Sequence, residues 1–495
     1  MANAARVSPP KISETLDRII KDLGLPTAGP SGLNAAWQHG SGLPTMKRAP
    51  ILKAILFGAI LAIRFFLFAQ ISLAADPDCR SDSGIPSGVI ASIDVGHLRK
   101  ALADAGFTIG GFYLGETFGN TGGMDQGETY DGVLWSYLLG DLHKAGLWKG
   151  LCFYADAYQI HGRSITADNI GSLVTVSNYE ALPSTRLSEL WLEQHLFNDH
   201  VTIRVGQLTA DTEFLLSSGG SNFLDSTWGW ATLPSFNLPG SGPTYPLSTP
   251  GVRVALKPND TWNLMVGVYN GDPAGAHCTG NPQVCDDDGL EFPLDSPPLV
   301  MAEGSYKYDQ KGRLPGTLKI GGWDQFGTLH EQPLGSGVTV ATTPNSVPIN
   351  TDWAVYAIVD QLVWRLPNSK DPKGIGIFAR VIGGPTEQNL VDFYADGGVT
   401  FSGMVPGRAD DKLGIGLAYS GLSNEAHALD VESGRPITLT HEALFEICYT
   451  AQLNPGWTLQ PDFQYILQPG GGIPERGKGA VPNAAVWGIR TTINF

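Results

Sequence analysis

The chain has no segment long and apolar enough for an ordinary transmembrane helix. An apolar run from Ala54 to Ile63 ends at Arg64, and no segment has the 18 or so consecutive apolar residues that a spanning helix needs. The mean hydropathy of −0.04 is also too polar for a helical membrane protein. A helical transporter is therefore excluded, and a retained anchor near Ala54 is the less favoured alternative to a cleaved signal.

Positive charge is scarce. Residues 1–75 hold 8 of the 32 Lys+Arg residues and 3 of the 48 Asp+Glu residues, so residues 76–495 carry a formal net charge of −21. Such an acidic chain would repel a phosphate backbone, and nucleic acid is excluded as a partner.

Catalytic motifs are missing as well. The ten His residues are scattered, and none lies at a motif-like spacing from a Ser. The segment Gly472–Gly479 resembles a phosphate-binding loop but has Gly479 in place of the required Ser or Thr. No internal repeat points to a propeller. We therefore predict no enzyme, no cofactor and no metal site, and read Asp286–Asp288 as a solvated acidic loop rather than a calcium site.

Cysteine is rare, with five residues and none before Ala75. Cys278 and Cys285 bracket a short loop, and an oxidising envelope would let them form a disulfide; the alternative is two free thiols. Cys152 and Cys448 fall inside predicted strands and are interpreted as small buried residues.

An export signal is present. Met46-Lys47-Arg48, a short apolar core and the small residues before Asp76 form the pattern of a secretory signal peptide. The expected organisation is an upstream extension absent from the mature protein (1–45), a signal peptide (46–75), a short periplasmic segment (76–106) and the main folded domain (107–495).

The last strand shows the pattern that defines the fold class. In Ala485–Phe495, Ala, Trp, Ile, Thr, Ile and Phe alternate with a largely polar set, as in a strand with one face to lipid and one to water. The same pattern predicts that residues 107–495 form an outer-membrane barrel, an all-β transmembrane antiparallel barrel of sixteen strands, with eighteen possible. The predicted strands are 107–115, 133–139, 151–160, 187–196, 200–207, 251–257, 262–269, 299–308, 316–323, 353–364, 374–383, 398–405, 412–420, 441–453, 457–467 and 484–495.

The connections between these strands alternate in length. Even-numbered joins such as Asn198-Asp199 and Pro406-Gly407 are short and carry turn residues. Odd-numbered joins are all predicted to be long, including 116–132, 208–250 and 384–397. Short periplasmic turns facing long extracellular loops are typical of outer-membrane barrels. A soluble β-rich envelope protein would have no reason to alternate in this way.

Charged residues in the strands alternate with apolar ones. A charged side chain facing lipid costs about 2–4 kcal/mol at the bilayer midplane, so these residues are expected to face the lumen. Near the strand 200–207, for example, Arg204 opposes Val201, Ile203 and Val205. Each such residue could equally be an ordinary pore-wall residue.

Several stretches together resemble the carbohydrate-selective porin family of the OprB type, over roughly residues 94–495. They are Leu187–Gln194, Arg204–Gln207, Glu213-Phe214, Tyr245–Arg253, Gly267–Pro273, Leu459–Ile466, Pro469–Gly471 and the final strand. The resemblance implies a monomeric barrel in the bacterial outer membrane that facilitates diffusion of sugars such as glucose, with sugars and outer-membrane lipid as its partners.

A sugar carries hydroxyls around its rim and C–H groups on its faces, so a sugar pore should offer charged groups and aromatic rings. The long loop 208–250 carries six aromatic residues and is expected to fold into or over the lumen; the alternative is packing on the barrel rim. A general or ion-selective porin remains the alternative function. Trp323 is a second candidate for a stacking wall. The substrate-binding candidates are Glu189, Trp191, Glu193, Arg204, Glu213, Arg253, Glu303, Arg380, Glu446 and Arg490.

Overall fold

The computed structural model describes Cys79 and residues 98–312, 314–327, 333–334, 338–339, 351–367, 369, 371–386, 389–424, 440–472 and 480–495. The predicted upstream extension, the predicted signal peptide and residues 473–479 lie outside this part of the chain. No helix among the described residues is long and apolar enough to cross a membrane.

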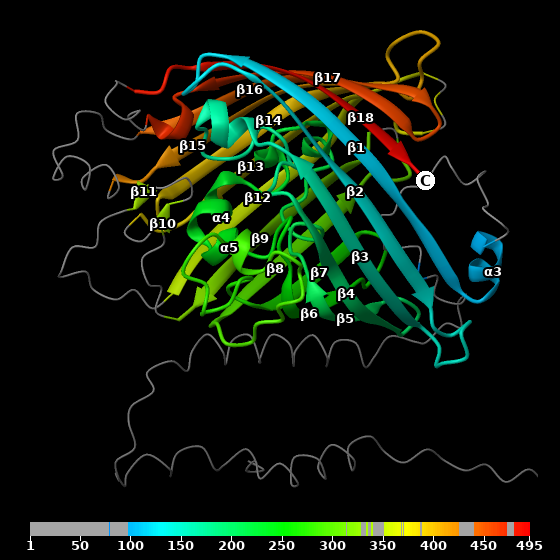
Figure 1. Cartoon of the computed structure of the whole chain (residues 1–495). Helices are drawn as coiled ribbons and strands as arrows, with labels where there is room; N and C mark the ends of the chain where they lie inside the picture. Colours follow the sequence, from blue (N-terminus) through cyan, green and yellow to red (C-terminus); the bar gives the residue numbers. More distant parts are fainter. Residues whose placement is uncertain are drawn as a thin grey trace, which may run out of the picture. The chain divides into compact units, whose positions relative to one another are not determined.

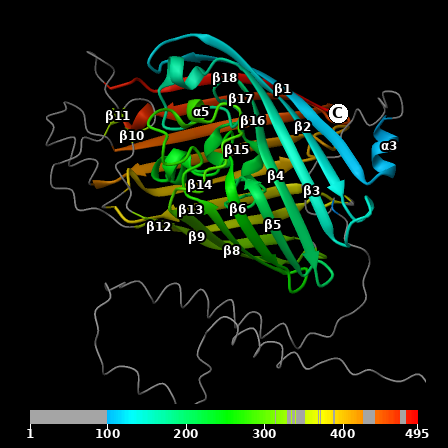
Figure 2. The ribbon, with the colours of Figure 1, turned by 60° about the horizontal axis from the view of Figure 1, so that its bottom comes forward.

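Sixteen antiparallel strands close into a barrel, in the order β1-β18-β17-β16-β15-β14-β13-β12-β9-β8-β7-β6-β5-β4-β3-β2 (Figures 1 and 2). The fold prediction is confirmed. The strands are β1 (Phe107–Thr121), β2 (Glu128–Asp141), β3 (Leu151–Gly162), β4 (Ser184–Leu196), β5 (Val201–Leu208), β6 (Thr249–Leu256), β7 (Trp262–Asn270), β8 (Pro298–Tyr308), β9 (Gly316–Phe326), β12 (Thr351–Arg365), β13 (Gly374–Gly383), β14 (Val391–Ser402), β15 (Lys412–Leu422), β16 (His441–Asn454), β17 (Trp457–Leu467) and β18 (Ala484–Asn494).

Short elements complete the fold. Helix α3 (Leu98–Asp104) precedes β1, and the helices α4 (Thr232–Asn237) and α5 (Pro282–Cys285) lie in long loops, as do the single turns η3 (Thr166–Ile170), η4 (Gly220–Asn222), η5 (Ser226–Trp228), η6 (Pro239–Ser241) and η7 (Pro469–Gly471). The strands β10 (Pro333–Leu334) and β11 (Val338–Thr339) form a separate two-stranded sheet.

Closure brings the two ends of the barrel sequence together. The first and last strands pair from Phe112 with Asn494 to Thr121 with Ala485. Gly111 and Phe495 also exchange backbone hydrogen bonds at 3.1 and 2.9 Å. The C-terminus and α3 therefore lie at the same end of the barrel, away from the long loops (Figure 1).

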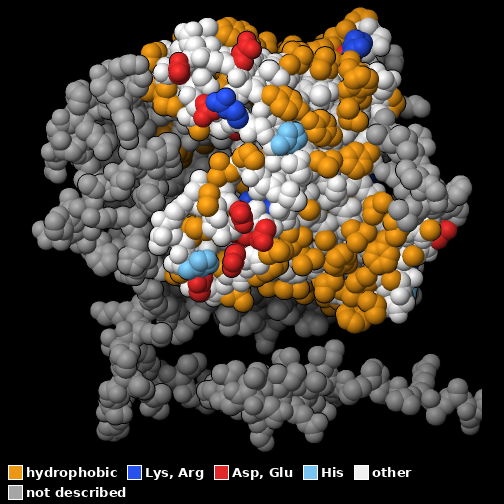
Figure 3. All heavy atoms as spheres, in the orientation of Figure 1, with side chains coloured by type: hydrophobic (Ala, Val, Ile, Leu, Met, Phe, Trp, Pro, Cys, Tyr) orange, Lys and Arg blue, Asp and Glu red, His pale blue; other side chains and the backbone are white. Residues whose placement is uncertain are grey.

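The two faces of each strand separate as the alternation predicts. Leu192, Val205 and Val252 are exposed on the outer wall, whereas Glu193 and Arg204 are buried inside it. Figure 3 shows hydrophobic side chains gathered over much of the outer surface. Because lipid replaces water against this surface, the apolar exterior needs no further covering.

Two predicted connections are wrong. The join 116–132 shrinks to residues 122–127, because β1 and β2 continue pairing through Glu116 with Asp131 and Phe118 with Thr129. Their polar inward residues looked like loop residues. The strand expected at 398–405 is β14, which begins at Val391 and shortens the join 384–397 to 384–390. The pair Gly397-Gly398 lies inside this strand, where the Phe378 ring sits over Gly398.

The interpretation of Cys152 is also wrong in part, because this residue is buried but not free. It forms a disulfide with Cys79, across a sequence separation of 73 residues, and thereby ties the segment before the barrel to β3. The sequence offered no local partner for Cys152. Cys278 and Cys285 form the second disulfide, and Cys448 is a buried free thiol.

Thiol labelling checks this pairing. Alkylation of denatured but unreduced protein should label Cys448 alone, and prior reduction should add the other four cysteines, as read by peptide mass spectrometry. Cys278→Ser should expose Cys285 as a second labelled residue. Labelling of two or more cysteines in the unreduced wild-type protein would contradict the two disulfides.

Candidate functional site

The interior of the barrel is occupied by loops rather than left open. The connection between β5 and β6, residues 209–248, carries the elements η4, η5, α4 and η6. Its Phe214, Leu224 and Trp228 are at most 2% exposed, and Figure 2 shows this green part of the chain within the ring of strands. This segment is called the inner loop below.

Strand β16 holds the inner loop through a buried carboxylate. Glu446 accepts hydrogen bonds from the backbone N–H groups of Leu224 at 2.6 Å and Asp225 at 3.3 Å, and from the Trp228 indole at 2.6 Å. Cys448, two residues along, donates its S–H to the Asn222 carbonyl at 2.9 Å. The Glu446 carboxylate thus replaces water for three loop donors that would otherwise be buried without partners.

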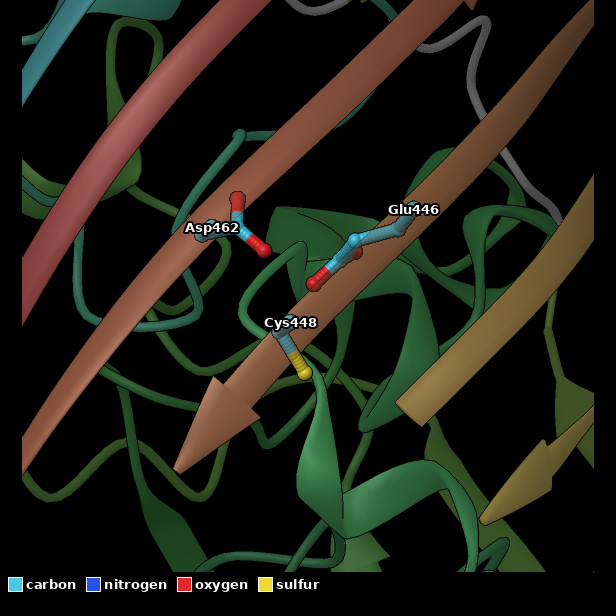
Figure 4. A group of neighbouring side chains, drawn as sticks. All are labelled: Glu446, Cys448 and Asp462. Carbon is cyan, nitrogen blue, oxygen red and sulfur yellow. The ribbon is translucent and has the colours of Figure 1, made fainter. Parts of the chain in front are cut away.

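Asp462 of β17 points toward the same space as Glu446 and Cys448 (Figure 4). One ligand atom from each of the three lies within 4.8 Å of the others, a spacing that could hold a metal ion. However, Glu446 and Cys448 already bind the inner loop, so their arrangement is explained by loop attachment.

Three strands along the wall from β16, Arg380 of β13 binds carbonyl groups of the same loop. Its guanidinium donates to the carbonyls of Leu215 at 3.0 Å, Thr227 at 2.6 Å and Gly229 at 2.9 Å. Asp396 of β14 neutralises it, with Nε to Oδ2 at 2.9 Å. A planar donor fork fits this set of converging carbonyls better than an ammonium would.

Aromatic packing reinforces these polar attachments. The Phe223 and Trp228 rings stack at 4.5 Å, and both contact Phe378 on β13 at 5.7 Å. The loop rings approach β15 closely because Gly414 and Gly416 have no side chain: a Cβ atom would lie 2.9 Å from Phe223 and 2.6 Å from Trp228.

A charge network crosses β4, β5 and β6. Glu193 forms ion pairs with Arg204 at 3.0 Å and with Arg253 at 2.7 Å. Glu213 of the inner loop forms ion pairs with the same two arginines, at 3.3 and 2.6 Å. The Arg204 guanidinium also lies 3.9 Å from the ring centre of Trp191. Two carboxylates and two guanidiniums therefore share one cluster between wall and loop.

Two further loops enter the lumen. In the loop between β3 and β4, Ser177 and Asn178 accept hydrogen bonds from Arg490 at 2.9 Å each, while Arg490 also pairs with Glu116 at 2.6 Å. In the loop between β7 and β8, Asp286 forms a buried ion pair with Arg186, at 3.4 Å. Glu303 of β8 accepts the Leu215 N–H at 3.2 Å and binds Lys319 at 3.4 Å.

Comparisons with known proteins agree with this architecture. The family model of the carbohydrate-selective porins, OprB family, matches residues 125–495. The chain belongs to this family. It is 26% identical over 446 residues to Porin B of Pseudomonas aeruginosa, covering 81% of this chain and 90% of that protein. It is 23% identical to the putative porin QuiX of Acinetobacter baylyi over 425 residues, 78% and 85% of the two chains.

A solved structure supports the fold. The high-pH structure of Pseudomonas putida OprB superposes with a TM-score of 0.69 and 20% identity, over 81% of this chain and 97% of that chain. The protein is thus an outer-membrane β-barrel channel of the carbohydrate-selective porin family.

Every residue predicted as a binding candidate in this porin is on or against the inner wall. Glu189, Glu193, Arg204, Glu213 and Arg253 lie together, with Glu189 accepting the Thr209 N–H at 3.0 Å. Trp191 packs on this group, while Glu303, Arg380, Glu446 and Arg490 lie at separate places where loops meet the wall. Whether any of them contacts a sugar stays a prediction.

The sequence analysis missed several buried residues of the lumen. Arg186 escaped because the register between β3 and β4 shifts between Ala155 and Ala157, so that Arg186 and Ser188 share the inner face with Glu189. Glu116 lay in a predicted loop. Asp396 lay just outside a misplaced strand, although its alternation with Tyr394 could have identified it.

Loss of one attachment should loosen the inner loop of the porin. Glu446→Gln replaces one accepting carboxylate oxygen with an NH2 group that cannot accept, and each buried N–H left unpaired costs about 1–3 kcal/mol. We expect larger and noisier single-channel conductance in planar bilayers. Glu128→Gln is the matched control, because Glu128 is exposed at the start of β2 and its neutralisation should leave conductance unchanged. Identical traces from wild type and Glu446→Gln would show that this carboxylate does not hold the loop.

The loop between β3 and β4 should respond to pH. Burial raises the pKa of Glu180 to about 7, against the lowering effect of hydrogen bonds from Ser164 and Thr166, and the Glu116 charge raises it further. Since ionisation of Glu180 is disfavoured in the folded loop, the attachment of the loop through Glu180 is strongest below the ordinary Glu pKa. This attachment weakens as the pH rises through about 7. Open-channel noise should therefore increase from pH 5 to pH 8, and less so in Glu180→Gln. Equal pH dependence in both proteins would refute this role for Glu180.

Proposed function

We propose that this porin supports passive, sugar-preferring diffusion of glucose-like monosaccharides, and that the inner loop forms the constriction. The attachment of residues 209–248 to inward-facing residues of the wall carries the proposal. A loop held at Glu446, Arg380 and Glu303 reduces the cross-section that sixteen strands alone would leave open. A narrowed pore with fixed polar groups is able to discriminate among solutes by size and hydrogen bonding.

The paired charges suit a neutral polyol. A sugar hydroxyl both donates and accepts, so neighbouring carboxylates and guanidiniums, such as Glu193 and Arg253, offer partners to both functions. Because the charges of this network are already paired with one another, a passing sugar exchanges weak contacts rather than neutralising a free ion. Weak binding is what flux requires.

The balance of buried charge argues against anionic solutes. Among the described strands, buried acids outnumber buried bases. The acids are Glu116, Asp131, Asp156, Glu189, Glu193, Glu303, Asp352, Asp396, Glu442, Glu446 and Asp462, and the bases are Arg186, Arg204, Arg253, Arg380 and Arg490. The same balance favours the alternative function, a general porin with cation preference. Following the family resemblance, we infer that the barrel works as a monomer.

Solute flux separates the two functions. In liposomes, glucose should enter faster than neutral amino acids of similar size. In planar bilayers, glucose should reduce the ion current in a saturable way, because it competes with water and ions for the lumen groups. Protein-free liposomes and a general porin are the controls. Entry rates that follow solute size alone, with no saturable block, would favour the general porin.

A further inference from the structure

Three aromatic rings on the inner face of β1 and β2 are only partly covered by the loops. They are Phe112, Trp135 and Tyr137, with ring centres 5.0 Å apart between Phe112 and Trp135 and 5.1 Å apart between Trp135 and Tyr137. These three residues are called the aromatic platform. Together they form one contiguous aromatic surface on this part of the inner wall.

The platform lies on the periplasmic side of the loops. Phe112 pairs across the strands with Trp135 on one side and with Asn494, next to the C-terminus, on the other. Tyr179 of the loop between β3 and β4 contacts Phe112 edge to face, with ring centres 5.6 Å apart. A solute that passes this loop therefore meets the platform next.

Two of the three rings are fixed in place on the inner wall. Tyr137 lies over Gly110, where a Cβ atom would be 2.6 Å from the Tyr137 hydroxyl and 2.8 Å from its ring carbon Cζ. The ring therefore rests against the sheet instead of projecting from it. Trp135 is fixed by its indole N–H, which donates to Asp156 Oδ2 at 2.7 Å. Fixed rings lose little conformational entropy when a ligand stacks on them.

The two tryptophans expected from the sequence to form a stacking wall are less available. Tyr154 stacks against Trp191 at 4.8 Å and the Arg204 guanidinium lies 3.9 Å from the Trp191 ring centre, so little of either ring face remains open. Trp191 and Trp323 are 5% and 4% exposed. The three platform rings, in contrast, are only half-buried, although Tyr137 also stacks on Tyr154 with ring centres 6.2 Å apart.

We propose that the aromatic platform binds the C–H face of a pyranose ring as the sugar leaves the constriction, an inference that rests on the proposed sugar transport. Glucopyranose in its chair form carries equatorial hydroxyls and presents axial C–H groups on both faces. Such a face matches an apolar ring surface, while the rim hydroxyls stay in water. An open-chain polyol with a similar number of hydroxyls has no such face. The platform therefore selects for ring form rather than for hydroxyl content.

Current-noise analysis in planar bilayers tests the platform, with glucose or sorbitol added on the periplasmic side. Phe112→Leu and the double variant Phe112→Leu/Tyr137→Leu keep apolar bulk but remove ring faces. We expect glucose binding to weaken about three- to tenfold for each ring removed, with sorbitol unaffected. Phe393→Leu, on the lipid-facing side of β14 and 44% exposed, is the matched control and should behave as wild type.

Gly110→Ala offers a second route, because it keeps all three rings but displaces Tyr137, and it should weaken glucose binding as well. Unchanged glucose binding in the double variant, or an equal loss for sorbitol, would overturn the platform while leaving sugar transport intact. If glucose does not bind to the wild-type channel at all, the proposed function and the platform both fail.

Discussion

A charged side chain on a membrane barrel has only one inexpensive direction, which is inward. Because lipid excludes it on one face, the alternation of each strand forces carboxylates and guanidiniums into the lumen. There they must find partners or water, and the loops provide the partners. Glu446 meets loop N–H groups and Arg380 meets loop carbonyls. The charged groups that are excluded from the lipid-facing surface are therefore the same groups that fix the loops inside the barrel.

As a result of this coupling, the loops occupy the interior of the barrel. The barrel wall is built of antiparallel strand pairs, as in many porins. The interior of this one depends on where the inner loop can approach the wall, which Gly414 and Gly416 permit, and on which charged residues receive it. Aromatic rings of the loop pack into the core, whereas Phe112, Trp135 and Tyr137 of β1 and β2 are only half-buried.

Much of the fold could be predicted from the sequence, because two-residue alternation and turn residues are local properties. All sixteen strands were located, and the buried charges of β5 and β6 were assigned to the correct face. The errors arose where the local pattern was ambiguous: the polar ends of β1 and β2, the glycine pair inside β14, and the register shift that places Arg186 beside Glu189. The partners of the charges could not be predicted. That Glu213 meets Arg253, or that Cys79 meets Cys152, depends on the path of loops and on closure of the barrel.

Hydrogen exchange of the purified porin in detergent tests most directly whether the inner loop is bound inside the barrel. Peptides covering residues 213–229 contain the Leu215, Leu224 and Asp225 amides that donate to Glu303 and Glu446. If these amides are held as described, such peptides should be protected to nearly the same degree as peptides from β13 and β16. Complete exchange within seconds, as in a solvated surface loop, would contradict the account.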